Sequence, residues 1–457
     1  MTGDVVLSLV AIPLTPIHVG DGSVLTPEDY DLDQGDLVRF SASAVLRSLP
    51  GSARKTYGDA LDRGDLHGAW RVLRQGRRRE HVLERIGVGE VAREEIRKLL
   101  GPELRAGEIR PMLRTGGAPC LPGSSLKGAL RTAMLSHLAK GRERAIEDAK
   151  RRHRPPRSGP ASDEAQKLLL GHADTDQDPF RFVAVSDIVL PAGSTRVDRV
   201  INWRPSRLRR GEAQPAEKMQ MIVERIRAAT DGAAVPMPVT LGIATGRLAA
   251  GRDRDRTGAK TPRRPIESGE LLVATNAFHW TLFDEERERF YADEPAIGAA
   301  LDAAFRVRAP DGTLLDEKAI RARTDMILLR VGRFCQFESK SLAGVRERWN
   351  PQAKPPRSMT VGNTRNLVKT AAHAPLVPFG WLLLAPPGTE SVAQPATVTA
   401  RPAGPSGRSA PKPPAGGRRW RLDGEEVTEI SRDADGVTVE FANGDLDTVS
   451  PDELERL

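Results

Sequence analysis

The chain has 457 residues, 39% of them hydrophobic, and only two cysteines, Cys120 and Cys335. This length suggests about three domains, at roughly 150 residues each. Two cysteines exclude a disulfide framework and a four-cysteine zinc site, so we expect a reducing, cytoplasmic setting. No apolar run reaches the ~18 residues of a membrane helix, and residues 5–14 lack the basic flank and cleavage site of a signal peptide.

Charge is distributed unevenly along the chain. The total is +8, while residues 418–457 carry five arginines against twelve acids, a net of −7. Subtracting this acidic tail leaves +15 on residues 1–417. A body this basic favours a polyanionic partner, most often nucleic acid. The alternative is a protein whose arginine content reflects only a proteome-wide bias.

Hydrophobic periodicity predicts a mixture of strands and helices up to residue 385. Ser41 and Ser43 are both candidates for the N-cap of the first helix. Residues 141–180 and 251–264 are polar, charged or proline-rich, and we expect them to be exposed excursions. In chain order, the pattern predicts strands at 5–12 and 37–40, helices from 41 and over 57–110 and 124–140, a strand at 182–190, a helix at 217–229, strands at 239–243 and 271–283, a helix at 284–305, and strands at 327–331 and 378–384.

The last 70 or so residues differ in composition from the rest. Residues 386–417 are dominated by Pro, Gly, Ala, Ser and Thr, which predicts a linker. Residues 418–457 contain short strand-like apolar runs, and Asn443-Gly444 is a strong hairpin signal. We expect a small acidic β-barrel of the SH3-like or Tudor-like type, although about 40 residues is short for one.

The most informative motif is Leu121-Pro-Gly-Ser-Ser-Leu-Lys-Gly-Ala-Leu-Arg131. Lys127 and Arg131 are four residues apart, so they share one helix face. A lysine in the first helical turn opposes the macrodipole, and an anion bound at the helix start would account for it. Backbone N–H groups, serine hydroxyls and the two cations would then converge on a phosphate. The alternative is an ordinary helix with two solvated cations.

A second motif is the turn Pro16-Ile-His-Val-Gly-Asp-Gly22. His18 is a candidate general acid/base or phosphate ligand, and the alternative is a structural histidine beside a turn. Acidic residues follow, and carboxylates can hold a divalent cation, but their spacing does not match an EF-hand loop, so we expect no metal site. These acids are Asp21, Glu28, Asp29, Asp31 and Asp33.

Together the two motifs resemble the RAMP superfamily of CRISPR proteins, and the second string matches the glycine-rich loop of that family. Further blocks narrow the resemblance: Val185-Ser-Asp-Ile188, Leu329-Arg-Val-Gly-Arg333 followed by Ser339-Lys-Ser-Leu342, and Pro378-Phe-Gly-Trp381. Their order over residues 5–385 is similar to that of the fifth Csm subunit in type III-A CRISPR effector complexes.

The resemblance implies an α+β fold with two ferredoxin-like (RRM-like) RAMP domains, residues 1–250 and 251–385, before the linker and barrel. It implies a non-catalytic, RNA-binding subunit of an antiviral Csm ribonucleoprotein, which caps the 3′ region of the CRISPR RNA (crRNA). Cofactors are not implied; partners are crRNA, other Csm subunits and host nucleases that trim the 3′ end. Carried over by position, the RNA-binding residues are His18, Gly20, Gly22, Gly123, Ser124, Ser125, Lys127, Gly128 and Arg131, with Arg330, Arg333 and Lys340 on a second basic surface.

Composition is consistent with binding to the RNA backbone. Only 4% of residues are aromatic, and the nearest approach to an RNP1 motif, residues 180–185, lacks its glycine. Stacking on bases is therefore not expected to dominate. The basic runs at 77–79, 151–157 and 204–210 are either additional electrostatic contacts or solvated surface.

Two enzymatic alternatives remain open. A metal-independent endoribonuclease that processes repeat RNA would use His18 as general acid/base, with Lys127 or Arg131 stabilising the charged intermediate. A metal-dependent enzyme that cleaves target RNA would use Asp21, Asp31 or Asp33.

Overall fold

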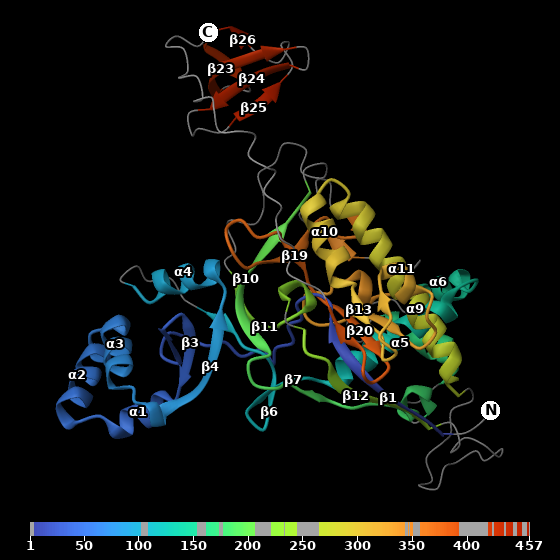
Figure 1. Cartoon of the computed structure of the whole chain (residues 1–457), viewed down its shortest axis with the longest axis horizontal. Helices are drawn as coiled ribbons and strands as arrows, with labels where there is room; N and C mark the ends of the chain where they lie inside the picture. The colour runs from blue at the N-terminus through green and yellow to red at the C-terminus, as the bar shows by residue number, and fades with distance from the viewer. Residues whose placement is uncertain are drawn as a thin grey trace. The chain divides into compact units, whose positions relative to one another are not determined.

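The chain forms two compact units, residues 1–398 and 399–457 (Figure 1). The expected basic loop at 251–264 lies outside the described residues, as does most of the expected linker. The computed structural model describes residues 4–101, 108–152, 161–172, 177–205, 221–232, 234–244, 265–342, 346, 348–350, 357–392, 419–422, 425–433, 436–441, 446–449 and 455–456.

The first sheet of the larger unit has five antiparallel strands in the order β15-β20-β1-β12-β8. In its central strand, β1, Leu7 pairs with Leu241 and Ala11 pairs with Leu384. Strands from both sides of residue 250 thus share one hydrogen-bonded layer. The strands are β1 (Asp4–Pro13), β8 (Val183–Val185), β12 (Met237–Ala244), β15 (Ile327–Arg330) and β20 (Trp381–Ala385).

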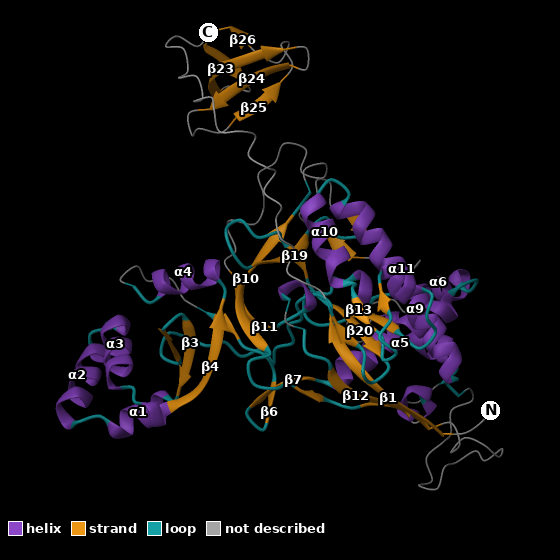
Figure 2. Cartoon of the chain, viewed as in Figure 1, coloured by secondary structure: helices purple, strands orange, loops and turns teal. Residues whose placement is uncertain are grey.

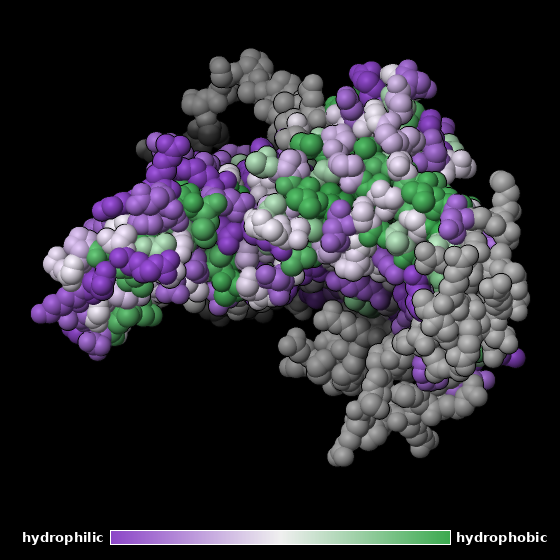
Figure 3. Space-filling model, turned by 90° about the horizontal axis from the view of Figure 1, so that it is seen from below, coloured by the Kyte–Doolittle hydropathy of each residue, from purple (hydrophilic) through white to green (hydrophobic). Residues whose placement is uncertain are grey.

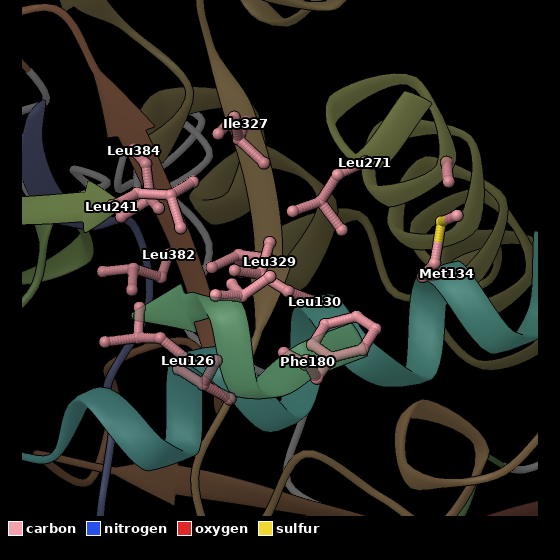
Figure 4. Packing of buried hydrophobic residues seen from close by; sticks show 14 of the residues in the cluster. Leu126, Leu130, Met134, Phe180, Leu241, Leu271, Ile327, Leu329, Leu382 and Leu384 are labelled. Atoms are coloured by element: carbon pink, nitrogen blue, oxygen red, sulfur yellow. The ribbon is translucent and has the colours of Figure 1, made fainter. Parts of the chain in front are cut away.

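Two neighbouring helices, α5 (Gly123–Ala139) and α9 (Ser268–Glu286), pack against this sheet. The α5 side chains Leu126 and Leu130, four residues apart, lie against Leu329 and Leu382 of the sheet (Figure 4). The alternate sheet residues, such as Leu328 and Leu383, belong to a second cluster with Phe283 and Phe305. Both faces of β15 and β20 are therefore buried, which explains why their sequences are apolar throughout.

The second sheet has the order β19-β18-β10-β4-β3-β2, with β11 pairing β10 and β5. Helix α4 (Glu90–Leu99) covers it through Ile96, which packs with Ile86 and Val197. The strands are β2 (Tyr30–Asp33), β3 (Asp36–Phe40), β4 (Val82–Val88), β5 (Ile109–Arg110), β10 (Thr195–Trp203), β11 (Met221–Ile226), β18 (Arg365–Lys369) and β19 (Val377–Pro378).

Three helices, α1 (Ala42–Ser48), α2 (Gly51–Asp62) and α3 (Leu66–Gly76), form an insertion between β3 and β4 (Figures 1 and 2). The Ala44 N–H donates to Ser41 Oγ at 3.2 Å, which confirms Ser41 as the N-cap. In the view of Figure 3, the insertion at the left presents mostly hydrophilic residues.

Shorter elements complete the larger unit. Among the described residues, no helix is both long and apolar enough to cross a membrane. The elements are β6 (Arg114–Thr115), β7 (Ala118–Leu121), β9 (Ile188–Val189), β13 (Val307–Arg308), β14 (Leu314–Leu315), β16 (Arg348–Asn350), β17 (Arg357–Met359), β21 (Glu390–Ser391), α6 (Glu143–Arg152), α7 (Ala161–Leu170), α10 (Pro295–Ala304), α11 (Glu317–Arg321), the π-helix η6 (Arg287–Tyr291) and the 3₁₀ helices η1 (Arg79–His81), η3 (Pro179–Phe182), η5 (Ala229–Asp231) and η7 (Glu338–Lys340).

The smaller unit is an antiparallel sheet in the order β25-β24-β23-β22-β26. Asn443-Gly444 lies outside the described residues, but the strands before and after it, β24 and β25, are paired as a hairpin requires. The strands are β22 (Arg419–Leu422), β23 (Glu425–Asp433), β24 (Gly436–Phe441), β25 (Leu446–Val449) and β26 (Glu455–Arg456).

The expected α+β class is confirmed, and so are the helix at 124–140 and the strands at 239–243 and 327–331. The region expected as one strand at 182–190 contains two short ones, β8 and β9.

Three predicted elements are wrong. The stretch expected as a strand at 271–283 lies in helix α9, because α9 contacts both core clusters and therefore lacks a polar face. Residues 217–229 contain strand β11 instead of a helix: Met221–Ile226 pairs along β10, and the charges of Glu224 and Arg225 are buried and paired within the sheet. Strand β4 interrupts the helix expected at 57–110, since its residues alternate between the two faces of a sheet.

We predict that Leu130→Ala lowers the free energy of unfolding by about 2–5 kcal/mol, because Leu130 is fully buried between α5 and the first sheet. Leu314→Ala is the control, since Leu314 is 58% exposed. Urea denaturation measures both. Equal stability of the two variants would contradict the packing described for α5.

Candidate nucleic-acid interface

The first turn of α5 is held against the end of strand β8. A Cβ on Gly123 would lie 2.1 Å from the carbonyl oxygen of Val185, so only glycine fits there. The Gly123 N–H donates to Oδ1 of Asp187 at 2.7 Å. The carboxylate of the Val185-Ser-Asp block thus occupies part of the positive end of the helix, where sequence reasoning expected an external anion.

The next residues of the helix line an open pocket of about 360 Å³. Here the first turn of α5 meets the turn after β1 and the loop after β15. We call this pocket the groove. Its lining residues are Val19, Gly20, Ser124, Ser125, Gly128, Ala129, Thr132, Arg330, Val331, Gly332, Arg333, Cys335, Ser339 and Lys340.

Gly128 is exposed on the groove side of α5, and a Cβ there would meet no atom within 4 Å. Packing within the chain therefore does not require glycine, although glycine in a helix costs about 1 kcal/mol relative to alanine. A ligand whose backbone approaches the helix closely would account for it.

Two cations stand at the mouth of the groove. Arg333 and Lys340 are both exposed, and neither forms an ion pair with a described residue. Among the described residues, the Lys340 ammonium donates only to the Arg333 carbonyl oxygen, at 3.4 Å. Their charges are therefore available to an anionic ligand.

Lys127 and Arg131 do not line the groove. Arg131 pairs with Asp178 at 2.7 Å, donates to Gln166 at 3.1 Å, and lies over the ring of Phe180. Lys127 is half-buried; burial lowers the pKa of its ammonium, and the nearby Asp178 opposes this shift. The two cations share a face, as predicted, but that face is turned toward Asp178.

Arg330 contributes to the groove wall from the interior. Its side chain is 4% exposed, forms an ion pair with Glu286 and lies over the ring of Trp381. Burial lowers the pKa of its guanidinium to about 9. Sequence reasoning placed Arg330 on a basic surface with Arg333 and Lys340, but its charge is neutralised inside the protein.

His18 lies beneath the groove and is only 1% exposed. Its Nδ1–H donates to the Glu224 carbonyl oxygen at 2.6 Å, and its ring stacks on Phe334. A Cβ on Gly20 would lie 3.1 Å from His18 Nε2. Burial lowers the pKa of His18 to about 4, so the ring is neutral at pH 7.

Gly332, which sequence reasoning did not select, joins the two loops of the groove. It has φ +93°, and a Cβ there would lie 2.8 Å from the His18 carbonyl oxygen. That oxygen accepts a hydrogen bond from the Arg333 N–H at 2.8 Å. The sequence did contain a signal for Gly332, because this residue lies within the motif Leu329-Arg-Val-Gly-Arg333. Only the arginines of that motif were predicted to bind RNA.

The remaining candidates lie outside the groove lining. Gly22 is exposed and has φ +95°, which favours glycine. Asp21 accepts hydrogen bonds from Ser23, and Asp33 pairs with Arg85. In the part of the chain that the structure describes, no three His, Cys, Asp or Glu residues gather as a metal site.

The buried histidine predicts a pH dependence of stability. The unfolded chain binds a proton at His18 near pH 6.5 and the folded chain only near pH 4, so stability falls as the pH drops through this window. The pKa difference limits this loss to on the order of 3 kcal/mol. The buried His279, whose pKa is lowered to about 3, acts in the same direction.

We therefore expect His18→Asn, which can keep a donor to Glu224, to reduce the dependence of unfolding free energy on pH between 6.5 and 4. Urea denaturation at several pH values measures this slope. A slope equal to that of the unchanged protein would contradict the buried, neutral state of His18.

The family model described as the RAMP superfamily matches residues 12–290. A chain from the "Csm-crRNA-target RNA ternary complex in type III-A CRISPR-Cas system" is similar in fold, with TM-score 0.53 and 16% identity, over 82% of this chain and 99% of that one. Csm5 of T. onnurineus aligns over the same shares with TM-score 0.42 and 17% identity. No curated protein matches. The chain belongs to the RAMP superfamily.

Proposed function

We propose that this protein is a non-catalytic, RNA-binding subunit of a type III-A CRISPR (Csm) effector complex, and that it holds the 3′ region of the crRNA. Membership of the RAMP superfamily and the fold shared with a chain of a Csm–crRNA–target RNA complex support the assignment. Its partners would be crRNA, the other Csm subunits and the nucleases that trim the 3′ end.

The observation that carries the proposal is the chemistry of the groove. It offers serine hydroxyls and exposed backbone at Gly20 and Gly128, together with the cations Arg333 and Lys340, which form no ion pair with a described residue. None of its lining residues is aromatic. Such a surface binds sugar and phosphate and reads no base, as a subunit that accepts many guide sequences requires.

The finer architecture belongs to the same proposal. We assign ferredoxin-like folds to the RAMP domains, and an SH3-like or Tudor-like barrel to the acidic sheet after residue 418. The strand pairing is compatible with the first assignment, because antiparallel strands from distant parts of the chain meet in the first and second sheets. It is compatible with the second, because the described strands of the smaller unit form one antiparallel sheet.

The geometry of His18 favours binding over cleavage. A general acid/base must come within hydrogen-bond reach of the reacting oxygen, yet His18 is buried beneath Gly20 with Nδ1 engaged by Glu224. The endoribonuclease alternative therefore gains no support from the site.

We predict that the purified protein leaves CRISPR repeat RNA intact in EDTA, because no described side chain of the groove is placed as a general base. Gel electrophoresis of end-labelled RNA measures this. Cleavage that His18→Ala abolishes would overturn the non-catalytic assignment.

We predict that Arg333→Ala with Lys340→Ala weakens binding to single-stranded RNA, because both cations would contact phosphates. The plot of log binding constant against log salt should flatten by roughly 0.7 for each lost contact. Fluorescence anisotropy over a salt series measures the slope.

The matched control is Lys127→Ala with Arg131→Ala, which removes the same formal charge. Because Asp178 already neutralises Arg131, this pair should change the slope less than the groove pair does. A groove pair with an unchanged slope would place the RNA elsewhere.

A further inference from the structure

A second pocket, of about 270 Å³, lies at the second sheet, between β4, the start of α4 and residues 191–196. We call it the arginine pocket. Its charged lining residues are Arg85, Arg93, Arg196, Arg227, Asp36 and Glu84, which sum to a net charge of +2.

Several of these charges are already balanced. Arg85 pairs with Asp33 at 2.6 Å. Arg196 lies 3.4 Å from Asp198. Glu84 is engaged by Arg39 at 3.1 Å and by Arg114.

Arg93 and Arg227 differ from their neighbours, since neither forms an ion pair with any described residue. The Nε atoms of both are buried and have no hydrogen-bond partner there. Within the part of the chain that the structure describes, the Arg93 side chain donates only to the Val88 carbonyl oxygen, at 3.0 Å. Both side chains are half-buried, and leaving the donor of a charged group buried without a partner is costly, so an anion in the pocket would be stabilised by these two guanidinium groups.

Phosphate is the anion that best suits this arrangement. A guanidinium presents a planar fork of donors that matches two phosphate oxygens. The neighbouring turn brings its backbone close to the pocket, and Gly193, with φ +77°, allows that approach.

The pocket lies near the groove along the chain. Pro119 on β7 lines the arginine pocket, and Ser124 on α5 lines the groove. Five residues span at most about 18 Å, a distance that a few nucleotides cover. The two linings are therefore close enough for one strand to reach both.

We propose that the arginine pocket binds a phosphate of the RNA strand that occupies the groove, through Arg93 and Arg227. This inference rests on the proposed function. A free polyphosphate would offer the same chemistry, so the experiment must separate the two sources.

The test compares Arg227→Gln, and Arg93→Gln with Arg227→Gln, against a charge-matched control, Arg306→Gln with Arg308→Gln. Both control residues are exposed and line neither site. The single variant Arg227→Gln is included because we expect it to fold normally, since the Arg227 side chain has no partner in the described residues. A change in its RNA binding can then be separated from a change in folding. Each full-length variant is titrated with single-stranded RNA over a salt series, and its melting temperature is measured with and without millimolar pyrophosphate.

We expect the salt slope to flatten by roughly 0.7 for the single variant and up to about 1.4 for the double, while the control keeps its slope. Equal slopes in all variants would overturn the proposal and leave the proposed function standing. A pocket-dependent rise in melting temperature with pyrophosphate, without a change in the RNA slope, would assign the pocket to free polyphosphate. RNA binding by no protein, including the unchanged one, would remove both proposals.

Discussion

The groove depends on one close approach between two backbone segments. The His18 carbonyl oxygen accepts the Arg333 N–H at 2.8 Å, and Gly332 has φ +93° at that point. A side chain on Gly332 would collide with the same oxygen, so both the conformation and the contact require glycine. This contact places the turn after β1 beside the loop after β15, although more than 300 residues separate them.

Cations near the groove divide into two classes by their partners. Arg131 and Arg330 are paired with Asp178 and Glu286, and they stabilise the packing around α5 and β15. Arg333 and Lys340 have no carboxylate partner among the described residues. A cation that is not already paired can neutralise a phosphate and so release the counterion condensed on the RNA; the second class therefore carries the electrostatic attraction in the proposed function.

The start of α5 shows how a fold can satisfy a local demand internally. Its macrodipole favours an anion, and Asp187 from a separate segment supplies one at the Gly123 N–H. What remains for a ligand is the flank of the helix at Ser124, Ser125 and Gly128, with the cations coming from another loop. The proposed RNA path therefore runs along the side of the helix start.

The helix at 124–140, the neighbouring strands, the basic charge of residues 1–417 and the family could be predicted from the sequence. These features depend on local periodicity, composition and short motifs. It could not decide which arginines are neutralised, since the partners of Arg131 and Arg330 lie 47 and 44 residues away. It also misassigned α9, because a helix buried against two clusters loses the amphipathic period. The sequence by itself determined the elements with one clear face and the residue types available for RNA. Tertiary structure alone decided which of those residues meet in one groove, because contacts across hundreds of residues leave no local pattern.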